Sequence, residues 1–192
     1  MIKKILFILI TANILVNAQS NARGLFMSVG IGPRIPVAEF SEKRTIGMGL
    51  EVELSYTDIS FLPVFFYAKA GYQHFPGKQS FYKISDLSSI STNLYSLSPG
   101  VRLYLEPISD TMVLLMPVLE MGVTANYLQT FNYFKTGVDK SSFTERKLNF
   151  GFHAGIGFSM FMLDVMAKYN HVPSAQYVSF DLSLRIPIFA TI

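Results

Sequence analysis

Apolar and polar side chains alternate with a strict period of two along residues 46–56. The segment reads Ile-Gly-Met-Gly-Leu-Glu-Val-Glu-Leu-Ser-Tyr, so every even position is apolar and every odd position is small or charged. Successive side chains of a β-strand point to opposite faces, whereas a helix would scatter these two sets around its circumference. The segment is therefore expected to be a strand with one apolar face and one polar face.

The same alternation returns in seven further segments. These are residues 25–32, 64–74, 94–105, 113–127, 148–160, 163–170 and 177–188. Single-chain barrels of the bacterial outer membrane have an even number of antiparallel strands with this period. The pattern therefore predicts an all-β chain folded as an eight-stranded antiparallel up-and-down transmembrane β-barrel.

The charged residues within these segments decide which face meets lipid. All nine of them occupy the alternate positions that form the polar face of each segment, which we call the polar parity. They are Glu51, Glu53, Lys69, Arg102, Glu120, Asp164, Lys168, Asp181 and Arg185. An Arg or Lys facing lipid at the bilayer midplane costs about 2–4 kcal/mol. The rival interpretation is a soluble eight-stranded barrel with an apolar interior. Glycine crowds the polar face, and small residues suit the inside of a narrow barrel, so the apolar face is expected to be the outer one.

The start of the chain has the pattern of a cleaved signal peptide. Lys3 and Lys4 precede an apolar stretch at residues 5–16, and Val16-Asn17-Ala18 offers a small-residue cleavage site. The stretch is shorter than the roughly 20 residues of a spanning helix. Residues 1–18 are therefore expected to be removed, which leaves residues 19–192 as the barrel and lowers the formal charge by two from +3. Such a charge gives no indication of nucleic-acid binding.

The connectors alternate between long and short, as the barrel orientation requires. Eight strands place both termini in the periplasm, and the long connectors outside the cell. The long connectors are 33–45, 75–92, 128–146 and the shorter 171–176, and the brief turns are 57–63, 106–111 and 160–162. Four outward-facing tyrosines lie at the extracellular ends of their strands, which predicts an aromatic girdle at the lipid headgroups: Tyr72, Tyr95, Tyr127 and Tyr169.

The long connectors carry more bases than acids. The bases are Arg34, Lys43, Arg44, Lys78, Lys83, Lys135, Lys140, Arg146 and Lys147, and the acids are Glu39, Glu42, Asp86, Asp139 and Glu145. A cationic rim suits the phosphates of an outer leaflet rich in lipopolysaccharide. Outer-membrane lipid and lipopolysaccharide are therefore the expected partners, and ordinary solvated loops explain the charges equally well.

Two of these connectors place aromatic side chains beside lysines. One group is Phe81, Tyr82 and Lys83, and the other is Phe131, Tyr133, Phe134 and Lys135. Exposed aromatics are enriched at protein interfaces, which predicts that another envelope protein binds here. Strands that extend the barrel above the membrane and pack these rings together explain the pattern equally well.

The nine inward charges are expected to fill the lumen as a salt-bridge network. The interior of an eight-stranded barrel is just wide enough for side chains, and an unpaired buried charge is costly. His153 and Tyr67 share this face. The alternative is a narrow ion pore, which requires that the charged layer leave the lumen open.

Residues that could carry catalysis are few. The chain has three histidines and no cysteine, so neither a metal site nor a cofactor is expected. Residues 169–175, Tyr-Asn-His-Val-Pro-Ser-Ala, resemble the histidine-serine segment of outer-membrane lipid A deacylases. In that family the serine follows the histidine by two residues, with an asparagine beside it and an acid on the final strand. Here Pro173 takes the serine position, Ser174 comes one residue later, and Arg185 stands in the region of the acid.

A serine needs an adjacent, oriented base to act as a nucleophile. The spacing of His171 and Ser174 therefore favours a chain without catalytic residues. A lipid hydrolase that uses this pair stays as the alternative function.

The mature chain as a whole resembles the outer-membrane β-barrel family that includes the small OmpA/OmpX-type barrels. The resemblance rests on the signal peptide, on alternating segments such as 47–54, and on a final strand that ends in residues 184–189, Leu-Arg-Ile-Pro-Ile-Phe. The chain departs from the family at Ala190-Thr191-Ile192, because such barrels usually finish on an aromatic residue; Phe189 would serve instead. The resemblance implies a non-catalytic integral outer-membrane protein that acts as a surface or accessory component through its extracellular loops.

Overall fold

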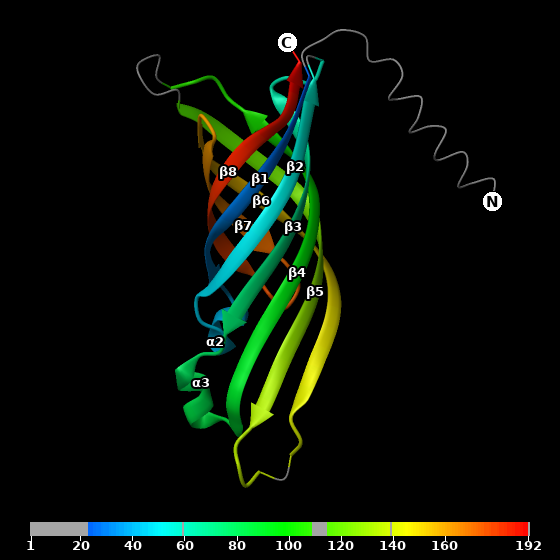
Figure 1. Cartoon of the computed structure of the whole chain (residues 1–192). Coiled ribbons are helices and arrows are strands. Elements are labelled where there is room, and N and C mark those ends of the chain that lie inside the picture. The colour runs from blue at the N-terminus through cyan, green and yellow to red at the C-terminus, as the bar shows by residue number, and fades with distance from the viewer. Residues whose placement is uncertain (1–22, 59, 109–114, 139, 192) are drawn as a thin grey trace, which may run out of the picture.

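The computed structural model describes residues 23–58, 60–108, 115–138 and 140–191, and in this part of the chain eight antiparallel strands close into one barrel (Figure 1). The strands are β1 (Arg23–Pro36), β2 (Gly47–Asp58), β3 (Val64–Pro76), β4 (Leu87–Tyr104), β5 (Leu115–Phe134), β6 (Phe143–Met160), β7 (Leu163–His171) and β8 (Tyr177–Thr191). Each strand pairs with its neighbours in sequence, and β1 pairs with β8. The predicted fold is confirmed. The expected signal peptide, residues 1–18, lies outside the described residues.

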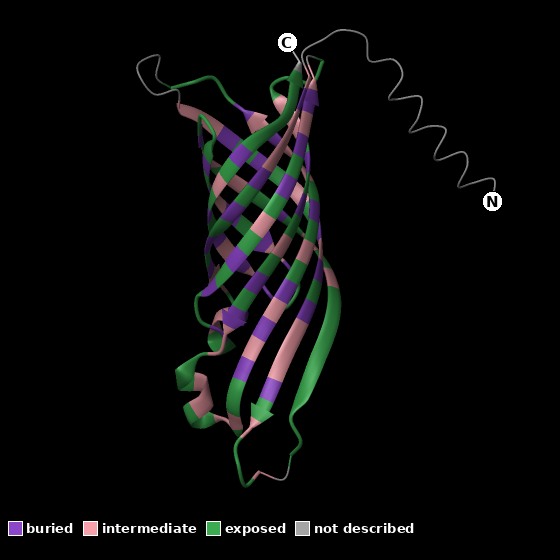
Figure 2. Ribbon diagram, viewed as in Figure 1, coloured by how far each residue is buried: buried purple, intermediate pink, exposed green. Residues whose placement is uncertain are grey.

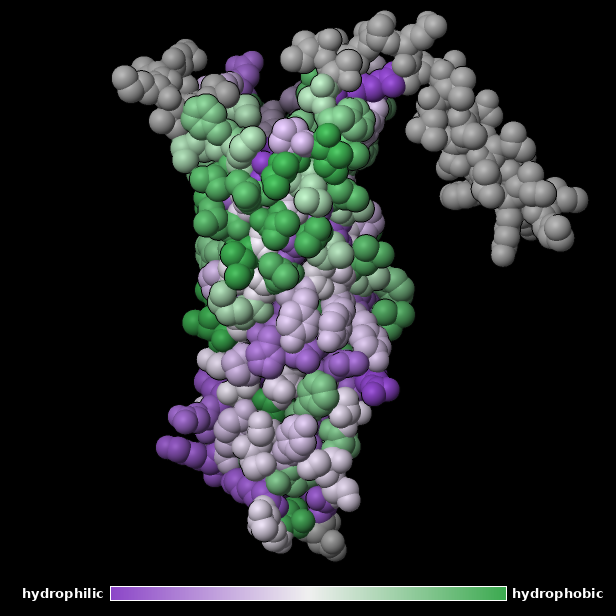
Figure 3. Space-filling view, viewed as in Figure 1, coloured by the Kyte–Doolittle hydropathy of each residue, from purple (hydrophilic) through white to green (hydrophobic). Residues whose placement is uncertain are grey.

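Burial alternates along the strands with the period that the sequence shows (Figure 2). In β2, Glu53 and Ser55 are buried, whereas Val52 and Leu54 are 41% and 48% exposed. Apolar side chains gather on the outer surface of the half of the barrel nearer the termini (Figure 3). The polar face is therefore the inner one, which rules out the soluble barrel with an apolar interior.

Three strands run past the others at the end of the barrel away from the termini (Figure 1). β4, β5 and β6 have 18, 20 and 18 residues, against 9 in β7. We call residues 87–93, 129–134 and 143–146 of these strands the distal projection. The sequence pattern predicts connectors at residues 75–92 and 128–146, and for the distal projection this prediction is wrong. An extension with water on both sides does not need the apolar and polar alternation on which that prediction depended.

Because these strands are longer than predicted, the connectors at this distal end are shorter than predicted. Two of these connectors contain small helices. Helix α2 (Phe40–Lys43) follows β1, and helix α3 (Gln79–Ile84) follows β3. At the opposite end, residues 161–162 form the predicted tight turn between β6 and β7. Within the described residues, no helix is long and apolar enough to cross a membrane.

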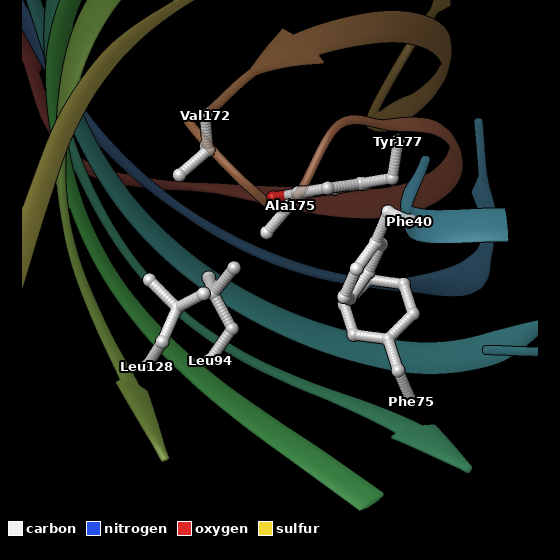
Figure 4. Close-up of a cluster of buried hydrophobic side chains, with 7 residues drawn as sticks. All are labelled: Phe40, Phe75, Leu94, Leu128, Val172, Ala175 and Tyr177. Carbon is white, nitrogen blue, oxygen red and sulfur yellow. The ribbon is translucent and has the colours of Figure 1, made fainter. Parts of the chain in front are cut away.

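Two apolar clusters close the interior, one near each end. The distal seal is made of Phe40, Phe75, Leu94, Leu128, Val172, Ala175 and Tyr177 (Figure 4). The proximal seal is made of Tyr104, Val118 and Met166, with Phe65 and Met116 packed against it. Edge-to-face ring pairs hold both, with centroids 4.9 Å apart for Phe40 and Phe75 and 4.8 Å apart for Phe65 and Tyr104. The polar lumen therefore lies between two apolar layers.

The four outward tyrosines lie on the outer surface, and three of them form a row. The Tyr72 and Tyr95 rings are 5.2 Å apart, and the Tyr95 and Tyr127 rings are 6.4 Å apart, across three adjacent strands. Tyr169 donates a hydrogen bond of 2.7 Å to the Gln176 side chain instead. The row is arranged as an aromatic girdle would be at the level where lipid headgroups begin.

Candidate functional site

The structure brings the nine charged side chains of the polar parity together in the lumen. Arg102 is at the centre and donates two parallel hydrogen bonds to the Glu53 carboxylate, at 2.8 and 2.7 Å. It also donates to Glu120, at 2.5 and 3.0 Å. A planar guanidinium can serve two carboxylates in this way because its five N–H groups point outward in a fixed fork.

The remaining charges extend this network in both directions along the lumen. Lys69 Nζ lies 2.6 Å from Glu120, and Lys168 Nζ lies 2.5 Å from Glu51 and 3.0 Å from Asp181. Arg185 pairs with Asp164 and covers the Tyr104 ring of the proximal seal, 4.9 Å from its centroid. Each charge therefore has an opposite charge close by, as a dry interior requires.

His153 and Tyr67 belong to the same network. The Tyr67 hydroxyl and His153 Nε2 share a hydrogen bond of 2.6 Å, and Nε2 lies 3.5 Å from the Glu120 carboxylate. The Tyr67 ring also faces Lys69, whose Nζ is 4.9 Å from its centroid. The hydroxyl, the imidazole and the carboxylate are all buried, so their side chains fill the space between the charged pairs and satisfy one another's hydrogen bonds.

Arg34 is a tenth member of the network, so its predicted place on the cationic rim is wrong. The predicted strand ends at residue 32, but β1 continues to Pro36 and Arg34 is fully buried. Its guanidinium lies 3.2 Å from Glu51 and 2.6 Å from Asp181. It fits because Gly49 faces it without a side chain; a β-carbon there would lie 2.6 Å from Cζ of Arg34. With Arg34, the network contains five acids and five bases.

Little space is left inside this network. A cavity of about 10 Å³ lies among Glu51, Glu53, Lys69, Arg102 and neighbouring residues, which is about the space that one water molecule needs. The distal and proximal seals lie beyond it at either end. In the described part of the barrel, the lumen is thus filled and sealed, an arrangement that does not support an ion pore.

The structure does not bring His171 and Ser174 together as a catalytic pair. The His171 ring stacks on Phe152 of β6, with centroids 4.9 Å apart, whereas exposed Ser174 lines a cavity at the barrel mouth. Among the residues that the structure describes, no carboxylate lies within ion-pair distance of the His171 ring and no hydrogen bond joins it to Ser174. No group of three His, Cys, Asp or Glu side chains in this part of the chain could hold a metal ion.

The two predicted partner-binding groups lie next to each other at the distal end. Lys135 Nζ donates a hydrogen bond of 2.7 Å to the Ser85 carbonyl, which joins the end of β5 to the segment after α3. Phe131, Tyr133 and Phe134 lie on β5 rather than in a loop, and Phe81, Tyr82 and Lys83 lie on α3. Phe81, Tyr82, Phe131 and Phe134 are half-buried, and Lys83, Tyr133 and Lys135 are exposed.

The two edges of the distal projection differ. Helix α3 covers the β4 edge, where the Tyr82 hydroxyl donates to the Ile90 carbonyl at 3.0 Å and accepts from the Ile90 N–H at 3.2 Å. On the other side, β6 pairs with β7 only from Phe152 onward. Within the described chain, no strand pairs with the outer edge of residues 143–148, which we call the open edge.

A larger cavity of about 420 Å³, the mouth cavity, lies between α2 and the inward face of the distal projection. It is lined by Glu39, Phe40, Glu42, Lys43, Arg44, Ile90, Leu128, Thr130, Asn132, Glu145, Lys147 and Ser174. Arg44 was expected on an exposed rim and is instead only 5% exposed, because the adjoining helix α2 packs Phe40 into the distal seal. Burial lowers the pKa of the Arg44 guanidinium to about 10, so the group remains charged at neutral pH.

Comparison with known proteins supports the fold. No protein-family model matches the sequence, and no curated protein does. Among solved structures, Neisserial surface protein A (NspA) superposes with a TM-score of 0.53 at 13% identity, over 87% of this chain and 99% of that one. The attachment invasion locus protein Ail of Yersinia pestis, solved with the heparin analogue sucrose octasulfate, gives 0.47 at 10% identity, over 88% and 100%.

The outer membrane enzyme PagL gives a TM-score of 0.38 at 18% identity, over 85% of this chain and 99% of that one. At such identities a likeness concerns the fold alone. The superposition with NspA supports that fold, and the sealed interior and apolar outer surface agree with it. This chain is a small eight-stranded outer-membrane β-barrel.

Proposed function

We propose that this barrel is a non-catalytic surface protein that binds another envelope protein through its distal projection. Both termini then face the periplasm, and the distal projection stands outside the cell. The observation that carries the proposal is the open edge of β6, a row of strand backbone that no other described strand pairs with. An unpaired strand edge is a template for a strand from another chain.

The interior supports the same conclusion by elimination. The lumen is filled by paired charges and closed by the distal and proximal seals. Solute passage and chemistry within the lumen therefore find no support, and a partner protein would bind to the outer surface of the barrel. The half of that surface nearer the termini is apolar, which suits lipid, and leaves the distal half for a protein partner (Figure 3).

The distal projection and the adjoining helix α3 also expose apolar side chains. Ile84, Tyr133 and Phe143 are 87%, 51% and 53% exposed. Phe143 lies on the open edge itself, so a partner strand added there would gain both backbone hydrogen bonds and an apolar side-chain contact, with Tyr133 and Ile84 exposed on the neighbouring β5 and α3. The covered β4 edge makes β6 the side from which a partner strand would add.

The test is affinity capture of the tagged barrel from outer membranes dissolved in mild detergent, followed by mass spectrometry. We expect one partner in stoichiometric amount. Capture should fall at least about tenfold in the triple variant Ile84→Ser, Tyr133→Ser, Phe143→Ser, because apolar anchors dominate such interfaces. The matched control replaces Phe61 and Ile108, exposed residues of the connectors at the end that holds the termini, by serine.

Recovery of the barrel with lipopolysaccharide only would contradict the proposal. Equal loss of the partner in the control variant would also contradict it, because the binding surface would then not be the distal projection. Hydrolysis of a lipid A ester that is abolished by both His171→Ala and Ser174→Ala would instead establish the enzymatic alternative.

A further inference from the structure

We propose that the mouth cavity binds a small organic acid that carries one negative charge, with Arg44 as the group that receives its carboxylate. Glu145 and Lys147 of residues 143–148 line the cavity, but the proposal does not depend on the open edge and would stand if no envelope partner were found. The cavity's volume of about 420 Å³ falls within the range typical of small-molecule pockets.

Arg44 is a buried base that forms no ion pair among the described residues. Its Nε donates to the Thr92 hydroxyl at 2.8 Å and its Nη1 donates to the Lys43 carbonyl at 3.3 Å. Within the described residues, no carboxylate lies within 4.0 Å of the guanidinium and nothing accepts a hydrogen bond from Nη2. An arginine has five donors in a fork that matches a carboxylate, so the free side of this fork is a ready anion site.

The burial of Arg44 gives a reason for a ligand to bind there. Taking a guanidinium out of water costs free energy unless an opposite charge compensates it. Burial lowers the pKa of Arg44 to about 10, and the nearby Tyr82 hydroxyl offsets only part of that effect. A bound carboxylate would supply the missing partner in a place where water competes weakly, which strengthens the ion pair.

The rest of the cavity suits the organic body of such a ligand. Phe40, Ile90 and Leu128 give an apolar floor that is continuous with the distal seal. Thr130 and Asn132 of β5 add a hydroxyl and an amide on the same wall. An apolar floor with a few placed polar groups is the usual composition of a small-molecule site.

The acids at the rim limit the charge of the ligand. Glu39, Glu42 and Glu145 line the same cavity, and their carboxylates would repel a second negative charge. Of the two other bases in the lining, Lys147 pairs with Glu145, 2.7 Å away, and Lys43 Nζ lies over the Phe81 ring, 5.9 Å from its centroid. A monoanion that reaches Arg44 is therefore favoured over a phosphate ester or a polyanion, which separates this site from one for lipopolysaccharide phosphates.

The test is ¹⁹F NMR of three probes added to the full barrel in phosphatidylcholine nanodiscs, with empty nanodiscs as the blank. The probes share one ring: 4-fluorobenzoate, the neutral 4-fluorobenzamide and the dianionic 4-fluorophenyl phosphate. We expect saturable line broadening for the benzoate, with a Kd on the order of 1 mM, and weaker or no binding of the other two.

Variants link the signal to the cavity. Arg44→Gln should weaken benzoate binding at least about tenfold, because a hydrogen bond to a charged group is lost. Arg146→Gln is the matched control, because Arg146 is exposed on β6 and does not line the cavity. The triple variant Glu39→Gln, Glu42→Gln, Glu145→Gln should let the phosphate probe bind, since it removes the repulsion and leaves Arg44 in place.

Three results would overturn the proposal. The first is no saturable benzoate binding by the wild-type barrel, and the second is equal binding of the neutral amide. The third is unchanged benzoate binding in Arg44→Gln. A variant that fails to fold is recognised by its circular dichroism, and the triple glutamate variant then still tests the site.

Discussion

The lumen and the mouth cavity contain the same kinds of charge in opposite arrangements. The lumen network joins five acids and five bases, and each has an opposite charge within ion-pair distance. The mouth cavity is lined by three acids and three bases, and the most buried of them, Arg44, pairs with no carboxylate among the described residues. Balanced composition therefore does not reveal whether charges stabilise a fold or remain free to bind; pairing does.

The surroundings explain why the two regions differ. The lumen lies between two apolar seals and holds little more than one water, so an unpaired charge there would be costly. The mouth cavity is open to water on its acidic side, where Glu39 and Glu42 are exposed and need no partner. Substitutions that remove a single charge should thus have large effects in the lumen and small ones at the mouth.

The largest effect is expected from Glu120→Gln in the lumen. This change leaves Lys69 and Arg102 short of a carboxylate in a buried site, and breaking a buried pair on one side costs about 3–5 kcal/mol. Urea unfolding in lipid vesicles, followed by circular dichroism, measures it. Glu145→Gln at the mouth is the control and should change the free energy of unfolding by less than about 1 kcal/mol. Similar losses in the two variants would remove the distinction between the regions.

The second comparison sets two buried arginines against each other. Arg34→Gln should cost about 3 kcal/mol, because Glu51 and Asp181 each lose a partner. Arg44→Gln should change the free energy of unfolding by no more than about 1 kcal/mol, since relief of an uncompensated charge offsets the lost hydrogen bond to Thr92. The same unfolding assay gives both values. A larger loss in Arg44→Gln than in Arg34→Gln would show that Arg44 is a structural group.

These two arginines also mark the limit of what the sequence could predict. The period of two gave the strands and put nine charges inside, because the bilayer makes that alternation obligatory. The nine charges that this period places in the lumen are five acids and four bases. This imbalance was the signal in the sequence that one inward base was missing. Arg34 was not among the inward charges because the predicted strand ends at residue 32, whereas β1 continues to Pro36.

The seals and the distal projection were missed for physical reasons. Phe65, Tyr104 and Leu94 break the pattern by placing apolar groups on the inward parity at the strand ends, and only tertiary packing shows that they meet. Beyond the membrane both faces of a strand are wet, so the period no longer marks it. Arg44 is buried by a helix of 4 residues, whose position depends on contacts far away in the sequence.

A third prediction tests how closely the lumen is packed around Arg34. Gly49→Ala introduces a β-carbon where the guanidinium now lies, and overpacking of this kind costs about 1–3 kcal/mol. The cost should be smaller in an Arg34→Gln background, because the shorter side chain leaves room. A double-mutant cycle on the unfolding free energies measures the difference. Strict additivity would mean that Gly49 does not make room for Arg34.

The smallest effect is expected for the Glu145–Lys147 pair at the mouth. Lys147 Nζ and Glu145 Oε1 are 2.7 Å apart, but both side chains are about half exposed. Such exposed pairs contribute about 0.2–1 kcal/mol to the free energy of unfolding. Their coupling, measured by a double-mutant cycle with alanine, should vanish at about 1 M salt, where the screening length is about 3 Å. The Lys69–Glu120 pair, at 2.6 Å and buried, should keep its coupling at that salt concentration. If salt weakened both couplings equally, water and ions would reach the lumen, and its pairing could no longer be attributed to a dry, sealed interior.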